Sequence, residues 1–271
     1  MIICDTHLHT SFSSDSQAPM EDMIKEAIHL GLKTICFTEH YDADFPEIES
    51  GLDFSLDFDA YYCKWKELSE KYRDRIEVLH GIELGVQPHL GPELDAFYEN
   101  YGGRYDYIIH STHLVDRLDP YERKYFDSYG AKEGLGRYFE ETYENLKVFD
   151  HYQSAGHLDY AARYMSKPCP EFSYRDYGDL LDAILTHIIS RDKALEVNTS
   201  GLKAGLDWPN PHMEILKRYH ELGGRRITLG SDAHRPEHMA YDFHKLPDIL
   251  KEAGFDHYEY YKKQKPILVM L

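Results

Sequence analysis

Short apolar segments rich in β-branched residues alternate with amphipathic segments along the whole 271-residue chain. This alternation is typical of repeated strand–helix units around a parallel sheet. We predict seven strands, at residues 2–9, 33–40, 76–84, 105–113, 151–157, 194–198 and 227–232. Because no linker or internal repeat divides the chain, we expect one α/β domain over residues 1–271. Closing seven units into a barrel would pair both edge strands and place a functional site beyond the carboxyl ends of the strands.

Helical periodicity is clearest in the first predicted helix, where apolar residues recur every three to four positions and a glycine follows: Met20, Met23, Ile24, Ala27, Ile28 and then Gly31. Similar patterns predict helices at 61–72, 94–101, 180–189, 213–222 and 246–253. The segment 116–136, rich in Tyr, Arg, Asp and Gly, follows neither the helical nor the strand period. We predict a long active-site loop there, because long irregular connections in compact domains are usually functional or disordered.

The charge of the chain limits its expected partners. With 48 acidic and 30 basic side chains, the formal net charge is −18 with histidine neutral. Nucleic acid is not an expected partner, because sequence-independent binding to phosphates needs clustered Lys and Arg. No apolar run approaches the roughly 20 residues that cross a bilayer, and the first residues lack the features of a signal peptide. We expect a cytoplasmic protein with a small-molecule substrate and no membrane partner, whose oligomeric state stays open.

Six of the seven predicted strands end in histidine or an acidic residue. The side chains at these ends are His7, His9, His40, Glu83, His113, His157, Asp232 and His234. With seventeen histidines in the chain, a His-x-His pair such as His7 and His9 is expected by chance. The evidence for a site is therefore the position of these residues at strand ends. Carboxyl ends of parallel strands meet at one end of a barrel, and ionisable groups gathered there need compensating cations. The four cysteines form no Cys-x-x-Cys pair, so the sequence predicts a metal centre of imidazoles and carboxylates.

The fourth predicted strand carries two histidines, and strand geometry separates them. In a regular strand His113 shares one face with Ser111, whereas His110 shares the other with Thr112. Only one imidazole can then point into the barrel. We favour His113 as the inward ligand and His110 as a core or supporting histidine.

The strand-end motifs, in order, resemble those of the PHP (polymerase and histidinol phosphatase) family. They are Asp5-Thr6-His7-Leu8-His9-Thr10 with Asp15, Thr38-Glu39-His40, Gly81-Ile82-Glu83, Ser111-Thr112-His113, Gly156-His157-Leu158-Asp159 and Ser231-Asp232-Ala233-His234. The resemblance covers nearly the whole chain and is strongest to the stand-alone phosphatases of the family, helped by residues 195–202. It implies a distorted (β/α)7 barrel.

The resemblance also implies a trinuclear metal centre with three divalent transition-metal ions (Zn, Mn or Fe). It assigns His7, His9, Glu83 and Asp232 to one ion, Glu83, His113 and His157 to a second, and Asp15, His40 and His234 to a third. Asp15 departs from the pattern, since the family often has histidine there. Oxygen ligation at that position would favour Mn or Fe relative to Zn.

The implied activity is metal-dependent hydrolysis of L-histidinol phosphate to L-histidinol and phosphate, in histidine biosynthesis. Asp232 would accept a proton from the attacking water, and His234 or a metal-bound water would protonate the leaving alkoxide. Arg163, six residues after His157, either clamps the phosphate or is an exposed helix arginine. Asn198 either lines the barrel mouth and binds substrate or caps the next helix. The sequence does not single out the carboxylate that would bind the amine and imidazole of the substrate.

Two alternatives remain at this stage. The same scaffold could act on another substrate, such as phosphotyrosine in proteins or, against the acidic charge, a nucleic acid. The chain could also be a catalytically silent metal-binding domain. A Gly-x-Ser-x-Gly element for serine catalysis and a phosphate-binding Gly-x-x-x-x-Gly-Lys-Ser/Thr loop are both absent from the sequence.

Overall fold

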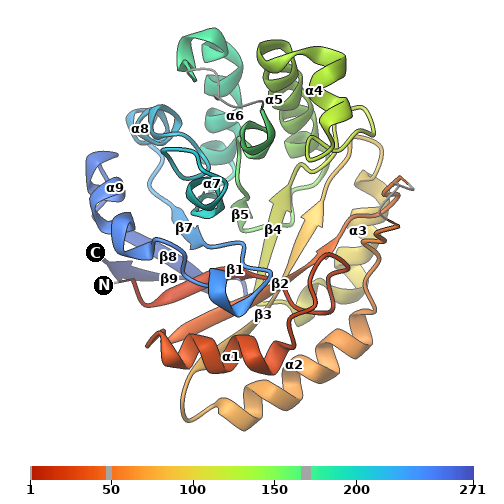
Figure 1. Ribbon diagram of the computed structural model, residues 1–271, viewed down its shortest axis with the longest axis vertical. Coiled ribbons are helices and arrows are strands. Elements are labelled where there is room, and N and C mark those ends of the chain that lie inside the picture. The colour runs from red at the N-terminus through yellow and green to blue at the C-terminus, as the bar shows by residue number, and fades with distance from the viewer. Residues whose placement is uncertain (1, 47–50, 166–171) are drawn as a thin grey trace.

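The computed structural model describes residues 2–46, 51–165 and 172–271 (Figure 1). Seven parallel strands form one sheet in sequence order: β1 Cys4–Leu8, β2 Thr34–Tyr41, β3 Glu77–Gly85, β4 Tyr107–Ser111, β5 Ser154–Ala155, β6 Ala194–Asn198 and β7 Ile227–Gly230. The first and last strands meet beyond β7, where Leu8 bridges Ala233 and the His9 amide donates to the Ala233 carbonyl at 3.0 Å. The sheet is therefore a nearly closed barrel, and the predicted fold class is confirmed.

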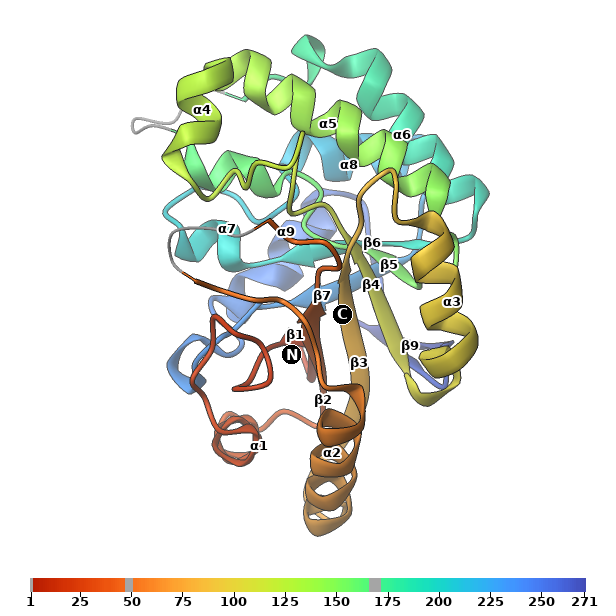
Figure 2. The same ribbon diagram turned by 90° about the vertical axis from the view of Figure 1, so that its right-hand side faces the viewer.

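Helices lie outside the barrel and cover the strands (Figures 1 and 2). The α-helices are α1 Met20–His29, α2 Phe58–Tyr72, α3 Gly91–Tyr101, α4 Arg123–Tyr129, α5 Ala131–Val148, α6 Gly178–Ser190, α7 Ser200–Lys203, α8 Met213–Glu221 and α9 Leu246–Glu252. Short 3₁₀ turns span Gly102–Arg104, Tyr160–Tyr164, Tyr174–Asp176, Pro236–His238 and Phe243–Lys245. In α1 the buried face is formed by the residues whose spacing predicted the helix, Met20, Met23, Ile24 and Ala27. Within the described part of the chain, every helix is too short or too polar to cross a bilayer.

The prediction of a long loop at 116–136 is wrong. Most of this segment is helical, because α4 and the first turns of α5 fall within it. The helical period was hidden by glycines that have a packing role. A Cβ on Gly134 would lie 3.1 Å from the Phe126 ring, so this glycine lets α4 and α5 pack closely. Residues 116–122 remain irregular and lead toward the site described below.

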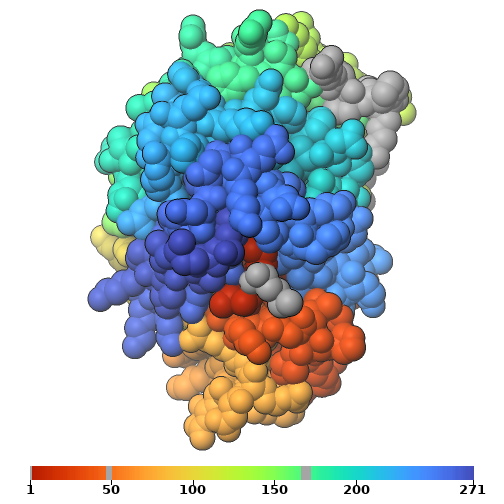
Figure 3. Space-filling model, turned by 90° about the vertical axis from the view of Figure 1, so that its left-hand side faces the viewer, coloured from red at the N-terminus to blue at the C-terminus, as the bar shows by residue number. Residues whose placement is uncertain are grey.

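A C-terminal hairpin that the sequence analysis did not anticipate closes the amino-terminal end of the barrel. Strands β8 His257–Lys262 and β9 Lys265–Met270 pair antiparallel across a turn whose two residues, Lys263 and Gln264, have positive φ. The Tyr261 ring packs with inward-facing apolar residues of the barrel, Cys36, Leu79, Tyr107, Ile109 and Ala194. Figure 3 shows this side of the molecule, where blue C-terminal residues lie beside red N-terminal ones. Apolar side chains thus fill the lower barrel and leave the carboxyl end for polar groups.

Candidate metal centre and active site

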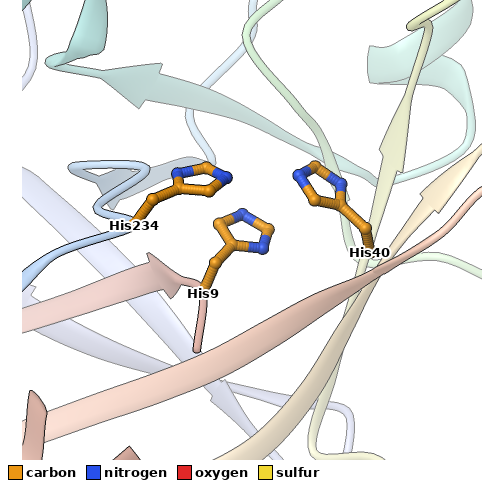
Figure 4. A group of neighbouring side chains, drawn as sticks. All are labelled: His9, His40 and His234. Atoms are coloured by element: carbon orange, nitrogen blue, oxygen red, sulfur yellow. The ribbon is translucent and has the colours of Figure 1, made fainter. Parts of the chain in front are cut away.

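All nine residues expected to bind metal lie together at the carboxyl end of the barrel. They come from β1 or the segment after it (His7, His9, Asp15), β2 (His40), β3 (Glu83), and the segments after β4 (His113), β5 (His157) and β7 (Asp232, His234). Figure 4 shows three of the imidazoles turned toward one another. The His9 ring centroid lies 4.1 Å from that of His40 and 4.2 Å from that of His234. The structure therefore brings these nine residues together.

Glu83 is the centre of this cluster. Its carboxylate is fully buried, and its two oxygens lie within 3.4 Å of nitrogens from five imidazoles: His7 (3.1 Å), His9 (3.4 Å), His40 (3.0 Å), His113 (3.1 Å) and His157 (2.8 Å). Burial alone would raise the pKa of Glu83, but His7, His113 and His40 together hold it well below its ordinary value. The carboxylate is therefore ionised and lies at the centre of the clustered imidazoles.

Two aspartates complete the cluster on its other side. Asp232 Oδ1 lies 3.5 Å from His9 Nε2 and 3.6 Å from His234 Nδ1. Asp15 Oδ2 lies 3.0 Å from His234 Nε2 and 3.6 Å from His40 Nε2. Asp232 has a left-handed backbone with φ of 55°, a conformation that is uncommon outside glycine and is often kept at functional sites.

The donor atoms of the cluster fit bound cations. His7 Nε2, His9 Nε2, His40 Nδ1, His234 Nε2 and Glu83 Oε2 are buried and have no hydrogen-bond partner in the described part of the chain. Leaving so many polar atoms unpaired costs free energy unless a ligand satisfies them. Several sets of three among these residues bring their ligand atoms within 4.8 Å of one another, including His7, His9 and Glu83. This part of the chain could therefore hold metal ions.

Residues around the cluster orient its imidazoles. His7 Nδ1 donates to Glu196 Oε1 at 2.6 Å, and His113 Nδ1 donates to Asp42 Oδ1 at 2.7 Å. Both contacts leave Nε2 as the nitrogen directed at Glu83, so that Nε2 is the atom that would bind a cation once its proton is displaced, which is the arrangement that metal-binding histidines use. Sequence reasoning missed Glu196 and Asp42. Both sit two positions from a residue it considered, so alternation along β2 and β6 could have indicated them.

Ser13 and Glu39 fix a third ring in the same way. Ser13 Oγ donates to Glu39 Oε2 at 2.6 Å, and it accepts from His9 Nδ1 at 3.2 Å and from the His40 amide at 3.0 Å. Because the hydroxyl proton goes to Glu39, the His9 ring must be the donor in its contact with Ser13. His9 Nε2 is then free to bind a cation.

His113 and His110 lie where strand geometry placed them. His113 Nε2 contacts Glu83, whereas His110 Nε2 contacts the Asn145 carbonyl at 3.1 Å, outside the cluster. Burial lowers the pKa of His110 to about 4, so this histidine is a neutral part of the core.

The outcomes differ for the two expected substrate-binding residues. Arg163 is not an exposed helix arginine: its side chain is 6% exposed, and it donates to Asn210 Oδ1 at 2.7 Å and to Asp232 Oδ2 at 2.9 Å. Asn198 is fully buried and is not part of the cavity lining, so its expected role in binding substrate stays a prediction. Its Oδ1 accepts from the Ser200 amide at 3.0 Å, but the N-cap residue of α7 is Thr199.

A cavity of about 510 Å³ opens over the cluster. Its lining includes the cations Arg163 and Lys203, the carboxylates Asp119 and Glu122, and the aromatic side chains Phe45, Phe54, Tyr121, Tyr160 and Tyr164. Lys203 and Asp119 are further residues that the sequence analysis did not single out. Burial lowers the pKa of Lys203 and raises that of Asp119 to about 6. The cavity thus has polar groups of both signs and an apolar wall.

Comparison with known proteins agrees with this geometry. The family model of the PHP domain matches residues 5–200. A histidinol-phosphatase of Lactococcus lactis is 33% identical over 255 residues, covering 93% of this chain and 91% of the relative. A probable histidinol-phosphatase of Clostridium acetobutylicum is 35% identical, covering 89% of this chain and 90% of the relative. The crystal structure of the Lactococcus lactis histidinol phosphate phosphatase, in complex with Zn, L-histidinol and phosphate, matches with a TM-score of 0.87 and 30% identity, covering 97% of this chain and 98% of that one.

Proposed function

The chain belongs to the PHP-domain family, and we propose that it is a metal-dependent histidinol-phosphatase, which hydrolyses L-histidinol phosphate to L-histidinol and phosphate in histidine biosynthesis. The observation that carries this conclusion is the buried Glu83 carboxylate among five imidazoles, beneath a cavity with both cationic and anionic walls. The structural relative with Zn, L-histidinol and phosphate supports the same reaction.

We propose three metal sites, using the nine clustered residues. His7, His9, Glu83 and Asp232 would hold one ion, Glu83, His113 and His157 a second, and Asp15, His40 and His234 a third. The support is the set of unpaired donor atoms and the oriented rings described above. Bound divalent cations would supply Lewis-acid charge that activates water and neutralises phosphate oxygens.

Arg163 is the residue best placed to bind the phosphate. Its Nη2 is buried without a hydrogen-bond partner in the described part of the chain, while Nε and Nη1 are held by Asn210 and Asp232. A guanidinium fixed on two sides keeps its geometry for an anion, so little side-chain entropy is lost on binding. Lys203, which also lines the cavity, adds a second positive charge.

Proton movements are assigned to the two residues that follow β7. Asp232 is buried, and His7 and Arg163 hold its pKa well below the ordinary value against the effect of burial, so it is ionised and accepts a hydrogen bond from the attacking water. His234 lines the cavity, and its side chain is 22% exposed. It therefore faces the space that a substrate would occupy, whereas His7 and His9 are fully enclosed, and His234 or a metal-bound water would protonate the leaving alkoxide.

The proposed centre predicts close to three ions per chain. Elemental analysis after reconstitution with excess Mn, Fe or Zn measures this number. A His110→Ala variant should bind the same number, because His110 lies outside the cluster. A reproducible maximum of one ion per chain would contradict the trinuclear assignment and leave a single-metal hydrolase.

Substrate preference tests the proposed reaction. We expect kcat/KM for L-histidinol phosphate to exceed that for p-nitrophenyl phosphate by at least about a hundredfold, or roughly 2.7 kcal/mol. Metal ions act on any phosphomonoester, so this preference must come from contacts to the organic part of the substrate. Steady-state kinetics with both esters and a phosphotyrosine peptide provide the measurement. Equal or faster turnover of the aromatic esters would favour the alternative phosphatase, and no turnover by the metal-loaded protein would favour a silent domain.

A further inference from the structure

The cavity over the metal cluster has carboxylates that the proposed chemistry does not use. Asp119 and Glu122 lie on the connection from β4 to α4 and line the cavity, outside the nine clustered residues. The other acidic residues of the lining are Asp15, Asp42 and Asp232, and each contacts an imidazole of the cluster. Asp119 and Glu122 are therefore the lining carboxylates that remain for a ligand.

Asp119 is held in a fixed place at this wall. Its Oδ1 accepts from the Tyr121 amide at 2.8 Å, which closes a local turn. The side chain is half-buried, and Tyr121 and Tyr160 line the same cavity. A desolvated carboxylate beside aromatic rings gains free energy when a cation pairs with it.

The cavity also has a positive charge beside Tyr160. The Arg163 guanidinium lies 5.1 Å from the centroid of the Tyr160 ring, and Arg163 ion-pairs with Asp232 of the cluster. The Arg163 side chain lines the cavity and is more than nine-tenths buried, and its Nη2 has no hydrogen-bond partner in the described part of the chain. An anion in the cavity could accept from this atom. The cavity thus suits a ligand with an anionic and a cationic end.

From this arrangement we infer that Asp119 binds the α-ammonium group of the substrate and sets the preference for amino-alcohol phosphates. The inference rests on the proposed function. In L-histidinol phosphate the amine is attached to the carbon next to the ester methylene, so its partner must lie close to the phosphate site. Asp119 satisfies this condition, because it lines the same cavity as His113 of the cluster and Arg163. The ammonium is also the group that carries positive charge at neutral pH, while most of the imidazole is neutral.

The test compares two substrates in matched variants. Asp119→Asn keeps an oxygen for the Tyr121 amide but removes the negative charge. We expect kcat/KM for L-histidinol phosphate to fall at least tenfold, mainly through KM, with less than a twofold change for the analogue that lacks the amine. Calorimetry with L-histidinol and inorganic phosphate should show a weaker affinity by at least fivefold. Asp127→Asn, an exposed charge change on α4, is the control and should leave both substrates unchanged.

Each outcome separates this inference from the proposed function. Equal losses for both substrates in Asp119→Asn, or no loss for either, would overturn the inference. An amine-specific loss in Glu122→Gln alone would also overturn it and move the role to Glu122. Asp119→Glu, which keeps the charge but shifts it, should recover part of the preference, and this variant serves if the Asn variant fails to fold. Failure of the wild-type protein to hydrolyse L-histidinol phosphate would instead reject the proposed function.

Discussion

Replacing Glu83 by glutamine should lower kcat/KM for L-histidinol phosphate at least about a thousandfold, or roughly 4 kcal/mol. The substitution keeps the shape of the side chain but removes the charge at the centre of five imidazoles. Glutamine keeps one oxygen, but its amide nitrogen has no lone pair for a cation, so the side chain could no longer serve both neighbouring metal sites proposed above. Steady-state kinetics and elemental analysis of the reconstituted variant measure both effects.

Glu77→Gln is the matched control for this variant. Glu77 lies at the start of the same strand, β3, six residues before Glu83 and at the opposite end of the barrel from the cluster. Its carboxylate accepts from Lys262 Nζ of the C-terminal hairpin at 2.6 Å. Its loss should leave turnover and metal content unchanged. A Glu83→Gln protein with near wild-type activity and a full metal complement would show that the carboxylate does not bridge ions.

The parallel strands could be predicted because each is a short apolar run ending in polar residues. Burial on both sides makes such runs nearly continuous in hydrophobicity, and β6 Ala194–Asn198 has the predicted bounds. The hairpin β8–β9 gave no such signal. Its residues 257–262 are mostly tyrosine and charged residues, and its turn at Lys263 and Gln264 lacks the Asn-Gly or Asp-Gly pair that usually marks a two-residue turn.

The cluster could be predicted because its members occupy equivalent places in successive units. A residue at the end of a parallel strand faces the same end of the barrel whatever its distance along the chain, as His7 and Asp232 show. The supporting residues carry a weaker mark, because only their two-residue spacing from His40 and Asn198 sets them apart. Asp42 and Glu196 are ordinary acidic residues among 48, and only the folded chain shows that they accept from His113 and His7. A strand-end position alone does not place a residue in the cavity lining, because Asn198 ends β6 and is not part of that lining.

The pair His113→Ala and His110→Ala should separate a ligand from a core residue on the same segment. Loss of His113 removes an imidazole beside Glu83, and we expect kcat/KM to fall at least about a hundredfold, the scale of losing one metal-centre contact. Loss of His110 leaves a cavity beside Tyr152 and an unpaired Asn145 carbonyl, which should cost about 2 kcal/mol of unfolding free energy with turnover within threefold.

Two measurements on each variant distinguish these effects. Denaturant unfolding reports the stability loss, and kinetics with metal analysis report the state of the cluster. Because both substitutions remove the same imidazole from positions three residues apart, a difference between them reflects the place of the ring and not its size or chemistry. If His113→Ala kept its metal and wild-type turnover while His110→Ala lost both, the inward residue of this segment would be His110, and the second metal site proposed here would have to be rebuilt around it.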